Sequence, residues 1–279
     1  MPSTKALSQS YLFVPGTRPE RFAKALASGA GAVILDLEDA VAPTDKESAR
    51  AAVCAWLLAN PSPGKAVFVR INDAATSWYA GDLQALSVLG GASLGLVLPK
   101  CESTAQIAHC LAPFAVLPAL IGIIESARGA QQVDAIAQAP GLGALAFGTL
   151  DYAVDLDLPS DSAGLAYTAA RIAIASRSAG LPAPIAGVTP ELDAARVTAD
   201  THWARSYGFA SKLCIHPAQV AAVHAALMPN AQQISWAHRV LAATEGQTSA
   251  VQVDGRMVDR PVILQAQAIL ARTNPSPHP

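Results

Sequence analysis

The stretch Val33–Val41, VILDLEDAV, begins as an uninterrupted apolar run and then places three carboxylates within four residues. A continuous apolar run is typical of a strand buried on both faces, as in a parallel sheet. The run stops at Asp36, Glu38 and Asp39. Ligands of parallel α/β folds bind beyond the carboxyl ends of the strands. The stretch therefore predicts a buried strand that ends at a functional site.

Seven further runs of this kind occur along the chain, each followed by a longer amphipathic stretch. In chain order the eight runs are 11–14, 32–37, 66–71, 94–98, 119–124, 144–147, 184–188 and 212–215. Alternation of strands and helices favours parallel strands joined by right-handed crossovers. Eight such units over about 230 residues predict a (β/α)8 TIM barrel, a fold that typically needs roughly 250 residues. A doubly wound open sheet is the alternative.

Helix signals lie between the runs. Thr44 and Glu47 have the T-x-x-E spacing of a capping box. The alanine-rich stretches 162–179 and 191–207 are each long enough for several helical turns, and a glycine follows each of them. These signals predict three of the helices that connect the strands.

The last fifty or so residues depart from the strand–helix rhythm. We expect a barrel over residues 1–228 and a C-terminal lid or arm over 229–279, within the same structural unit. The arm is predicted to contain helices over 231–243 and 261–271, with a turn at Asp254–Gly255 between them.

The composition of the chain narrows the class of protein. Of its 279 residues 52% are hydrophobic and only 14% are charged, against about 25% charged in typical domains. A net charge of −2 gives no basic surface for nucleic acid. The longest uncharged apolar run, 110–124, is interrupted by two prolines and is too short to cross a bilayer. The four cysteines show no CxxC spacing, so we expect reduced thiols in a cytoplasmic protein.

Polar residues end six of the eight runs, and in a parallel barrel they meet at one rim. In chain order they are Asp36, Glu38 and Asp39 after the second run, Arg70 and Asn72 after the third, Lys100 and Glu102 after the fourth, Glu125 after the fifth, Asp151 after the sixth and His216 after the eighth. A barrel built for stability alone has little reason to gather these groups at one end, so we expect an active site there.

Glu125 and Asp151 follow adjacent strands and form a candidate metal pair. Mg²⁺ takes one or two carboxylates and completes its octahedron with water and substrate oxygens. Zinc is disfavoured because no His and Cys cluster has ligand spacing. The alternatives are that Glu125 only caps the next helix and that Asp151 is a turn residue.

Arg70 shares a strand face with Phe68, so its guanidinium is expected to be buried and to need an anion. Two interpretations stay open: an internal salt bridge to Asp36 or Glu38, or a clamp on a substrate carboxylate or thioester oxygen. Asp36 and Glu38, two residues apart, share a face and are expected to orient Arg70 or metal-bound water. Asp39 is expected to start the following loop.

Two other motifs are interpreted as structural. Gly141–Ala146 matches the GxGxxA dinucleotide fingerprint, but its glycines precede a strand instead of following one. His216–Pro217 is expected to open a helix, and a structural imidazole is favoured over a catalytic one.

A set of motifs that occur in order along the chain resembles the citrate lyase beta subunit and malyl-CoA lyase family. They are 12–16 (LFVPG), 36–41 (DLEDAV), 69–72 (VRIN), 76–78 (TxW), 82–83 (DL), 98–100 (LPK), 124–129 (IESARG), 147–151 (FGxxD), 215–217 (IHP) and 255–261 (GRMVDxP). The set covers nearly the whole chain and is highly specific, whereas any single motif would be weak.

The resemblance implies a TIM barrel that assembles as a homotrimer or hexamer. It implies Mg²⁺ held by Glu125 and Asp151, with Arg70 and Glu125 in contact with substrate. It also implies that Asp259 enters the site of a neighbouring subunit as an acid/base; a helix N-cap before Pro261 is its alternative role. The chain departs from the family pattern where Gln9 replaces an arginine and Ala186 replaces an acid.

The function expected from this resemblance is a Mg²⁺-dependent carbon–carbon lyase. It would cleave a 3-hydroxyacyl-CoA of the citramalyl-, malyl- or citryl-CoA type to an acyl-CoA and a 2-oxo acid by retro-Claisen chemistry. Two alternatives are a metal-dependent aldolase acting on free hydroxy-oxo acids and a citrate lyase beta subunit that needs an acyl-carrier partner. A phosphate-binding barrel enzyme is less favoured, because no glycine-rich loop follows the last two strands.

Overall fold

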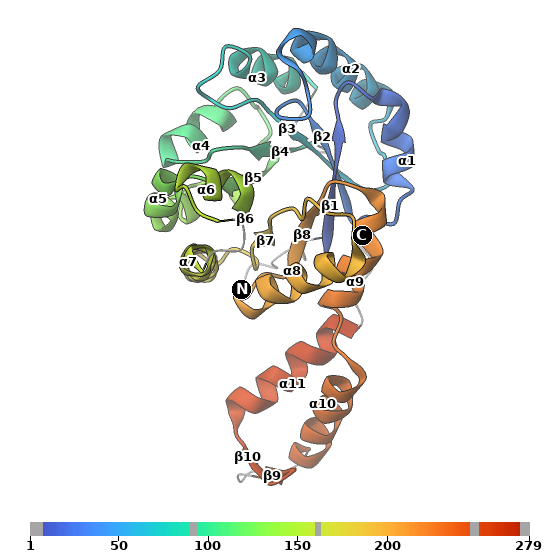
Figure 1. Cartoon of the computed structure of the whole chain (residues 1–279), viewed down its shortest axis with the longest axis vertical. Coiled ribbons are helices and arrows are strands. Elements are labelled where there is room, and N and C mark those ends of the chain that lie inside the picture. The colour runs from blue at the N-terminus through green and yellow to red at the C-terminus, as the bar shows by residue number, and fades with distance from the viewer. Residues whose placement is uncertain (1–7, 90–93, 160–162, 246–250, 274–279) are drawn as a thin grey trace. The chain divides into compact units, whose positions relative to one another are not determined.

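The computed structural model describes residues 8–89, 94–159, 163–245 and 251–273. The chain divides into two compact units, Met1–His224 and Ala225–Pro279. Figure 1 shows the first with its strands at the centre and the second as a helix pair. No helix among the described residues is long and apolar enough to cross a membrane. The predicted role of the C-terminal residues as a lid or arm of the same structural unit stays a prediction.

A closed barrel of eight parallel strands forms the first unit, which confirms the predicted TIM barrel. Each strand pairs with the next, and β1 closes the ring on β8. The strands are β1 (Ser10–Pro15), β2 (Ala32–Asp36), β3 (Ala66–Arg70), β4 (Leu94–Leu98), β5 (Ala119–Ile124), β6 (Leu142–Phe147), β7 (Ile185–Ala186) and β8 (Ser211–Cys214). All eight apolar runs of the sequence correspond to these strands.

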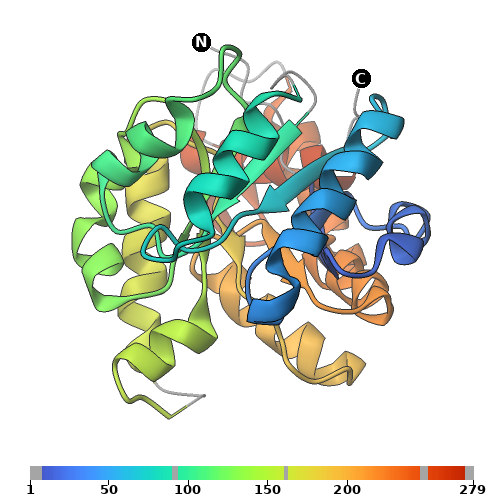
Figure 2. The ribbon, with the colours of Figure 1, turned by 90° about the horizontal axis from the view of Figure 1, so that it is seen from above.

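Helices surround the strands, as Figure 1 shows, and Figure 2 gives the view turned by 90°. They are η1 (Pro19–Arg21), α1 (Phe22–Leu26), η2 (Pro43–Asp45), α2 (Lys46–Ala59), α3 (Tyr79–Ser87), α4 (Thr104–Leu111), α5 (Ala127–Ala137), α6 (Thr149–Asp155), α7 (Gly164–Ser178), α8 (Ala194–Ser206), η4 (Pro217–Gln219) and α9 (Val220–Leu227). The helices predicted over 162–179 and 191–207 are α7 and α8, within three residues at each end.

The predicted capping box at Thr44 and Glu47 is wrong. Pro43 already starts the 3-10 turn η2, so α2 begins after Asp45, which makes no side-chain cap. The Thr44 hydroxyl instead donates to Asp45 Oδ1 at 3.4 Å. A proline at the first helical position presets the backbone for the turn, and here that places Thr44 inside the turn.

The barrel interior is filled by alternate residues of the strands. A buried cluster contains, among others, Tyr11, Ile34, Phe68, Val97, Ile121, Ile185 and Leu213. The rings of Tyr11 and Phe68 pack edge to face with centroids 5.7 Å apart. Gly95 lies directly against Phe68, and a Cβ at this position would overlap the ring. Because alternate residues share a face, Arg70 points to the same inner side as Phe68.

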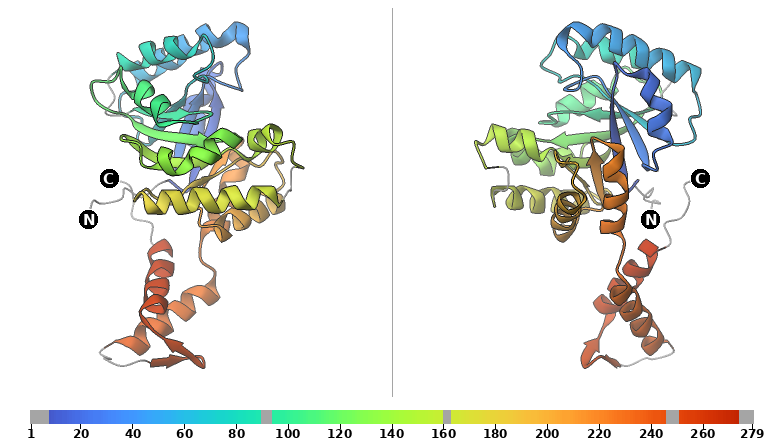
Figure 3. Two further views of the ribbon diagram at one scale, coloured as in Figure 1. Left: turned by 90° about the vertical axis from the view of Figure 1, so that its left-hand side faces the viewer. Right: turned by 45° about the vertical axis from the view of Figure 1, so that its right-hand side comes forward.

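The second unit contains α10 (Ala231–Thr244), the antiparallel strands β9 (Val251–Val253) and β10 (Arg256–Val258), and α11 (Arg260–Thr273). Figure 3 shows the strand pair at one end of the two helices. Asp254 and Gly255 both have positive φ, 50° and 77°, as a tight hairpin turn requires. Both predicted helices and the predicted turn are confirmed.

Replacing Gly95 by alanine tests the packing of the barrel interior. The added Cβ forces Phe68 or the β4 backbone to move, so we expect a loss of about 1–3 kcal/mol in the free energy of unfolding. Denaturant unfolding measures the loss. In the background of Phe68→Leu the same substitution should cost clearly less, because the ring that it meets is gone. Strictly additive losses in the double variant would contradict the packing assignment.

Candidate active site

Arg70 and Asp36 form the central contact at the carboxyl end of the barrel. They are the last residues of β3 and β2 and are direct partners in the sheet register. Arg70 donates from Nε to Asp36 Oδ1 and from NH2 to Asp36 Oδ2, both at 2.7 Å. The guanidinium also lies over the Phe13 ring, 4.7 Å from its centroid. In this structure, the internal salt bridge that the sequence left open is therefore present, as a two-pronged and charge-assisted pair.

Two further acids of the same loop face Arg70. Its NH1 lies 3.0 Å from Glu38 Oε2 and 3.2 Å from Asp39 Oδ2. Asp36 also accepts backbone N–H bonds from Glu38 at 2.9 Å and Ala40 at 3.1 Å, so one carboxylate orients Arg70 and the loop together. The predicted role of Asp36 and Glu38 in orienting Arg70 is consistent with these contacts.

Glu38 is a buried acid with an unusual proton affinity. Its side chain is 8% exposed. Burial raises its pKa to about 8, against the lowering effect of Arg70, and the charges of Asp39, Glu125 and Asp36 raise it further. Near neutral pH the carboxyl group therefore holds a proton for much of the time. The sequence alone did not indicate this property, because it depends on depth and neighbours.

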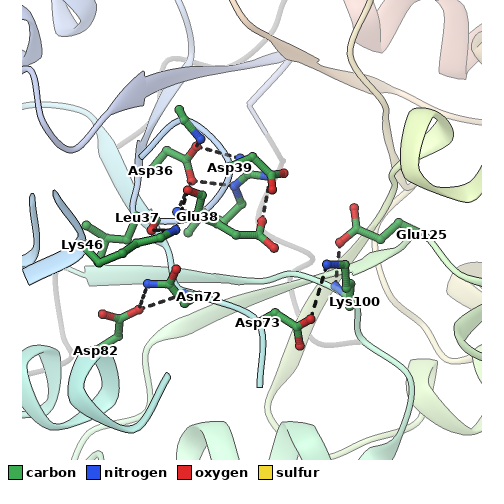
Figure 4. Close-up of polar contacts among 12 residues, drawn as sticks. Asp36, Leu37, Glu38, Asp39, Lys46, Asn72, Asp73, Asp82, Lys100 and Glu125 are labelled. Carbon is green, nitrogen blue, oxygen red and sulfur yellow. Dashed lines mark hydrogen bonds and ion pairs between the residues drawn. The ribbon is translucent and has the colours of Figure 1, made fainter. Parts of the chain in front are cut away.

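Lys46 binds the backbone of the loop that follows β2. It was not identified from the sequence. Its ammonium group donates to the carbonyls of Leu37 at 2.8 Å and Glu38 at 2.7 Å. It is buried and lies over the Trp78 ring, 5.3 Å from the centroid. Figure 4 shows Lys46 beside Leu37 and Glu38. Two bonds to consecutive carbonyls fix the direction in which the loop leaves β2.

The chain after β3 is held by a second buried network. Asp82, which is fully buried, accepts from Arg50 Nε at 2.7 Å and from the backbone and side-chain nitrogens of Asn72 at 2.8 and 2.7 Å. Asn72, expected at the rim, is thus bonded to α3 (Figure 4). This network is structural and fixes the segment that follows Arg70.

Glu125 follows β5 and is almost completely buried, at 5% exposure. Its Oε1 accepts the backbone N–H of Lys100 at 2.7 Å, and its Oε2 lies against Gly148, where a Cβ would collide with it. Helix α5 is capped by the Ser126 hydroxyl, which accepts from the N–H of Gly129 at 3.1 Å. The capping alternative for Glu125 is therefore wrong.

The amide of Lys100 reaches Glu125 because Lys100 adopts a left-handed conformation with φ of 42°. Such a conformation is uncommon outside glycine. The Lys100 ammonium group lies 3.4 Å from Asp73 Oδ2. Figure 4 shows Lys100, Asp73 and Glu125 on one side of the site, with Asp36, Glu38 and Asp39 on the other.

Asp151 lies in the first turn of α6 and is exposed. It makes no hydrogen bond or ion pair with any described residue, so its carboxylate is available to a ligand. Its charge helps to raise the pKa of Glu125 to about 7, behind the larger effect of burial and against the Lys100 N–H bond. A buried carboxyl group beside a second, exposed carboxylate is a fitting donor set for a divalent cation.

No cluster of three or more His, Cys, Asp or Glu residues with metal-binding geometry occurs in the described part of the chain. The donor set fits an ion that takes two carboxylates and completes its shell with water and substrate oxygens. The chemistry of the two acids thus agrees with the magnesium predicted from the sequence, and the assignment of the ligands stays a prediction.

The remaining candidates have structural contacts. His216 caps η4, with Nδ1 accepting the N–H of Ala218 at 3.2 Å, so the helix start expected at His216–Pro217 is confirmed, while the structural role of the imidazole stays a prediction. Asp259, in the second unit, accepts the N–H of Val262 at 3.3 Å as the N-cap alternative expected. Its predicted entry into the site of a neighbouring subunit stays a prediction.

The raised pKa of Glu38 predicts how stability changes with pH. A carboxyl group whose pKa is higher in the folded state stabilises the fold at low pH, and this contribution is lost as pH rises from about 4.5 to about 8. In metal-free buffer, Glu38→Gln should remove about 1–4 kcal/mol of that pH dependence. Thermal unfolding at a series of pH values measures it. Glu20→Gln, at an exposed site, is the control; a Glu38→Gln profile parallel to that of the control would contradict the prediction.

Comparison with known proteins matches residues 9–217 to the family model described as HpcH/HpaI aldolase/citrate lyase. A citrate lyase subunit beta-like protein of Mycobacterium tuberculosis is 38% identical over 96% of both chains. A (3S)-malyl-CoA thioesterase of Cereibacter sphaeroides is 32% identical over 95% of this chain and 94% of that protein.

Solved structures agree with these sequence relationships. The protein CitE of M. tuberculosis, in complex with magnesium, acetoacetate and coenzyme A, is similar with a TM-score of 0.85 and 34% identity, over 96% of this chain and 99% of that chain. A second structure, RipC of Yersinia pestis, is also 34% identical, with a TM-score of 0.70 over 81% of this chain and 98% of that chain. With its TIM barrel and its ordered motifs, the chain belongs to the HpcH/HpaI aldolase/citrate lyase family, a family of lyases.

Proposed function

We propose that this protein is a Mg²⁺-dependent carbon–carbon lyase. Its substrate is a 3-hydroxyacyl-CoA of the citramalyl-, malyl- or citryl-CoA type, and its products are an acyl-CoA and a 2-oxo acid. The observation that carries the proposal is the arrangement of Arg70, at the end of β3, with Glu125 and Asp151, which follow β5 and β6, at one end of the barrel. The related CitE structure that binds magnesium, acetoacetate and coenzyme A supports it.

Glu125 and Asp151 hold the metal in this proposal. The Lys100 N–H fixes Glu125 Oε1, and Gly148 leaves room for Oε2 beside the first turn of α6, where Asp151 lies. Bound there, Mg²⁺ supplies a positive charge that lowers the cost of removing the proton from the substrate hydroxyl. Glu125 and Asp151 would hold the ion, and its remaining positions would be open to oxygen atoms of water and substrate.

Arg70 stabilises the negative charge that develops on the thioester oxygen when the C–C bond breaks. Asp36 fixes the plane of the guanidinium through two bonds, so this donor needs little rearrangement during the reaction. A protonated Glu38 leaves the positive charge of Arg70 less neutralised than a triple ion pair would. In this proposal the raised pKa of Glu38 therefore leaves more of the positive charge of Arg70 available to the thioester oxygen.

Asp259 supplies the proton to the carbanion carbon in this proposal, from the second unit of a neighbouring subunit. Its support is the GRMVDxP motif and the resemblance to the malyl-CoA lyases. The assembly is then a homotrimer or hexamer, as that resemblance implies. A site shared between subunits would keep the reaction incomplete until the assembly forms.

A substrate panel tests the proposed activity. The isolated protein should cleave at least one of citramalyl-, malyl- and citryl-CoA with Mg²⁺ present and not with a chelator. Glu125→Gln and Asp151→Asn should each lower kcat/KM by about a hundredfold or more and weaken Mg²⁺ binding measured by calorimetry. Asp134→Asn, a mostly exposed carboxylate on α5, is the control and should change neither quantity. Full activity in both metal-pair variants would overturn the assignment.

The same panel separates the two alternative functions. A metal-dependent aldolase would cleave free hydroxy-oxo acids and show no preference for the CoA thioester. A beta subunit of a larger complex would stay inactive on CoA thioesters until an acyl-carrier protein is supplied. The second alternative has support from the similarity to a citrate lyase subunit beta of Leuconostoc mesenteroides, 30% identical over 98% of this chain.

Mixed oligomers test the role of Asp259. Asp259→Asn and Glu125→Gln should each be inactive alone, yet oligomers assembled from both variants should regain part of the activity. The reason is that a subunit with an intact metal pair receives an intact Asp259 from its neighbour. If Asp259 served its own subunit, every site in the mixture would carry one defect. Activity no higher than that of the separate variants would therefore contradict the shared site.

A further inference from the structure

A separate pocket lies on the outer side of β7 and β8. Alternation along the strands places Ile185 and Leu213 in the interior cluster, so Ala186 and Lys212 face the opposite side, toward the helices. The pocket, of about 340 Å³, is lined by these two residues, by the loop after β7 and by parts of α6, α7 and α8. Arg70, which shares the inner face of the barrel with Phe68, is not among its lining residues.

Lys212 is a buried ammonium group with few partners. It is 3% exposed, and its Nζ donates to the carbonyl of Gly187 at 2.6 Å. It has no other hydrogen bond, and no carboxylate within 4 Å, among the described residues. An ammonium group has three N–H donors, so two of them are available to a ligand in the pocket. Burial also lowers the pKa of Lys212 to about 8, against the opposing effect of Asp200.

The nearest acid of the pocket is already engaged. Asp200 accepts from the Thr189 hydroxyl at 2.7 Å and pairs with Arg196 Nε at 3.0 Å. The residue opposite Lys212 in the sheet register is Ala186, whose methyl group supplies no charge. A buried cation without a paired anion is costly. A negatively charged group placed beside the Lys212 ammonium group would therefore be stabilising.

We propose that this pocket binds a small monocarboxylate, with its carboxylate on Lys212 Nζ and its short aliphatic tail against Leu150, Leu165 and Trp203, which line the same cavity. A single charge fits because Arg196 is already paired and because Asp200 and Glu191 would repel a second negative charge. The volume lies within the roughly 300–1,000 Å³ of small-ligand pockets. The assignment of this site does not rest on the proposed lyase reaction.

Butyrate is the probe for the first test, in metal-free buffer at constant ionic strength, with binding measured by calorimetry. The wild-type protein should bind butyrate saturably, with one site per chain, and butyramide, which lacks the charge, should bind at least tenfold more weakly. Lys212→Met should lose at least tenfold in affinity for butyrate. Absence of saturable binding to the wild type, equal binding of butyramide, or unchanged affinity in Lys212→Met would overturn the proposal.

A matched pair at Ala186 provides the second test, which does not depend on how Lys212→Met folds. Ala186→Asp places a built-in carboxylate opposite Lys212, whereas Ala186→Asn adds the same shape without the charge. Thermal unfolding should show a higher melting temperature for Ala186→Asp than for Ala186→Asn, and Ala186→Asp should no longer bind butyrate. Equal melting temperatures, or butyrate binding by Ala186→Asp at wild-type affinity, would contradict the proposal.

Discussion

The paired hydrogen bonds between Arg70 and Asp36 are the contact on which the arrangement of the site depends. The two residues are register partners at the ends of neighbouring strands, so the barrel itself places them face to face. Asp36 then extends the constraint to its own loop through two backbone N–H bonds. In a parallel barrel, residues at the carboxyl ends of the strands meet at one rim. Here the guanidinium group of Arg70 lies there beside the carboxylates of Asp36, Glu38 and Asp39.

Burial and neighbouring charges together set the pKa values of the acids at this rim. Burial raises the pKa of both Glu38 and Glu125 above that of an ordinary glutamate, and the charge of Glu125 raises the pKa of Glu38 further. Arg70 offsets part of this effect on one side of the site. On the other side neither Glu125 nor Asp151 forms an ion pair with a described residue, and a divalent ion would offset the repulsion that helps to raise the pKa of Glu125. This arrangement of acids is consistent with the magnesium site proposed above.

Buried lysines show a second pattern that linear spacing conceals. Lys46 and Lys212 both donate to backbone carbonyls of residues that follow a strand, at Leu37 and Glu38 after β2 and at Gly187 after β7. The Lys46 ammonium group has two carbonyls and an aromatic ring as partners. The Lys212 ammonium group donates to one carbonyl among the described residues and lines a cavity. The difference lies in the neighbours that tertiary packing supplies, so the same residue type is structural in one place and a candidate binding group in the other.

The sequence by itself determined the eight strands, the barrel and the rim residues, because apolar runs and their polar stops depend on local burial patterns that a parallel sheet must have. It also indicated Arg70, Asp36, Glu38, Glu125 and Asp151, since strand ends in such a barrel converge. It misplaced the cap of α2, where Pro43 starts a turn too early for Thr44. Only the tertiary structure decided that Arg70 pairs with Asp36, that Ser126 frees Glu125 from capping, and that Lys212 lacks an anion. Those outcomes depend on distances of a few ångströms between residues far apart in the chain, and no periodicity along the chain encodes them.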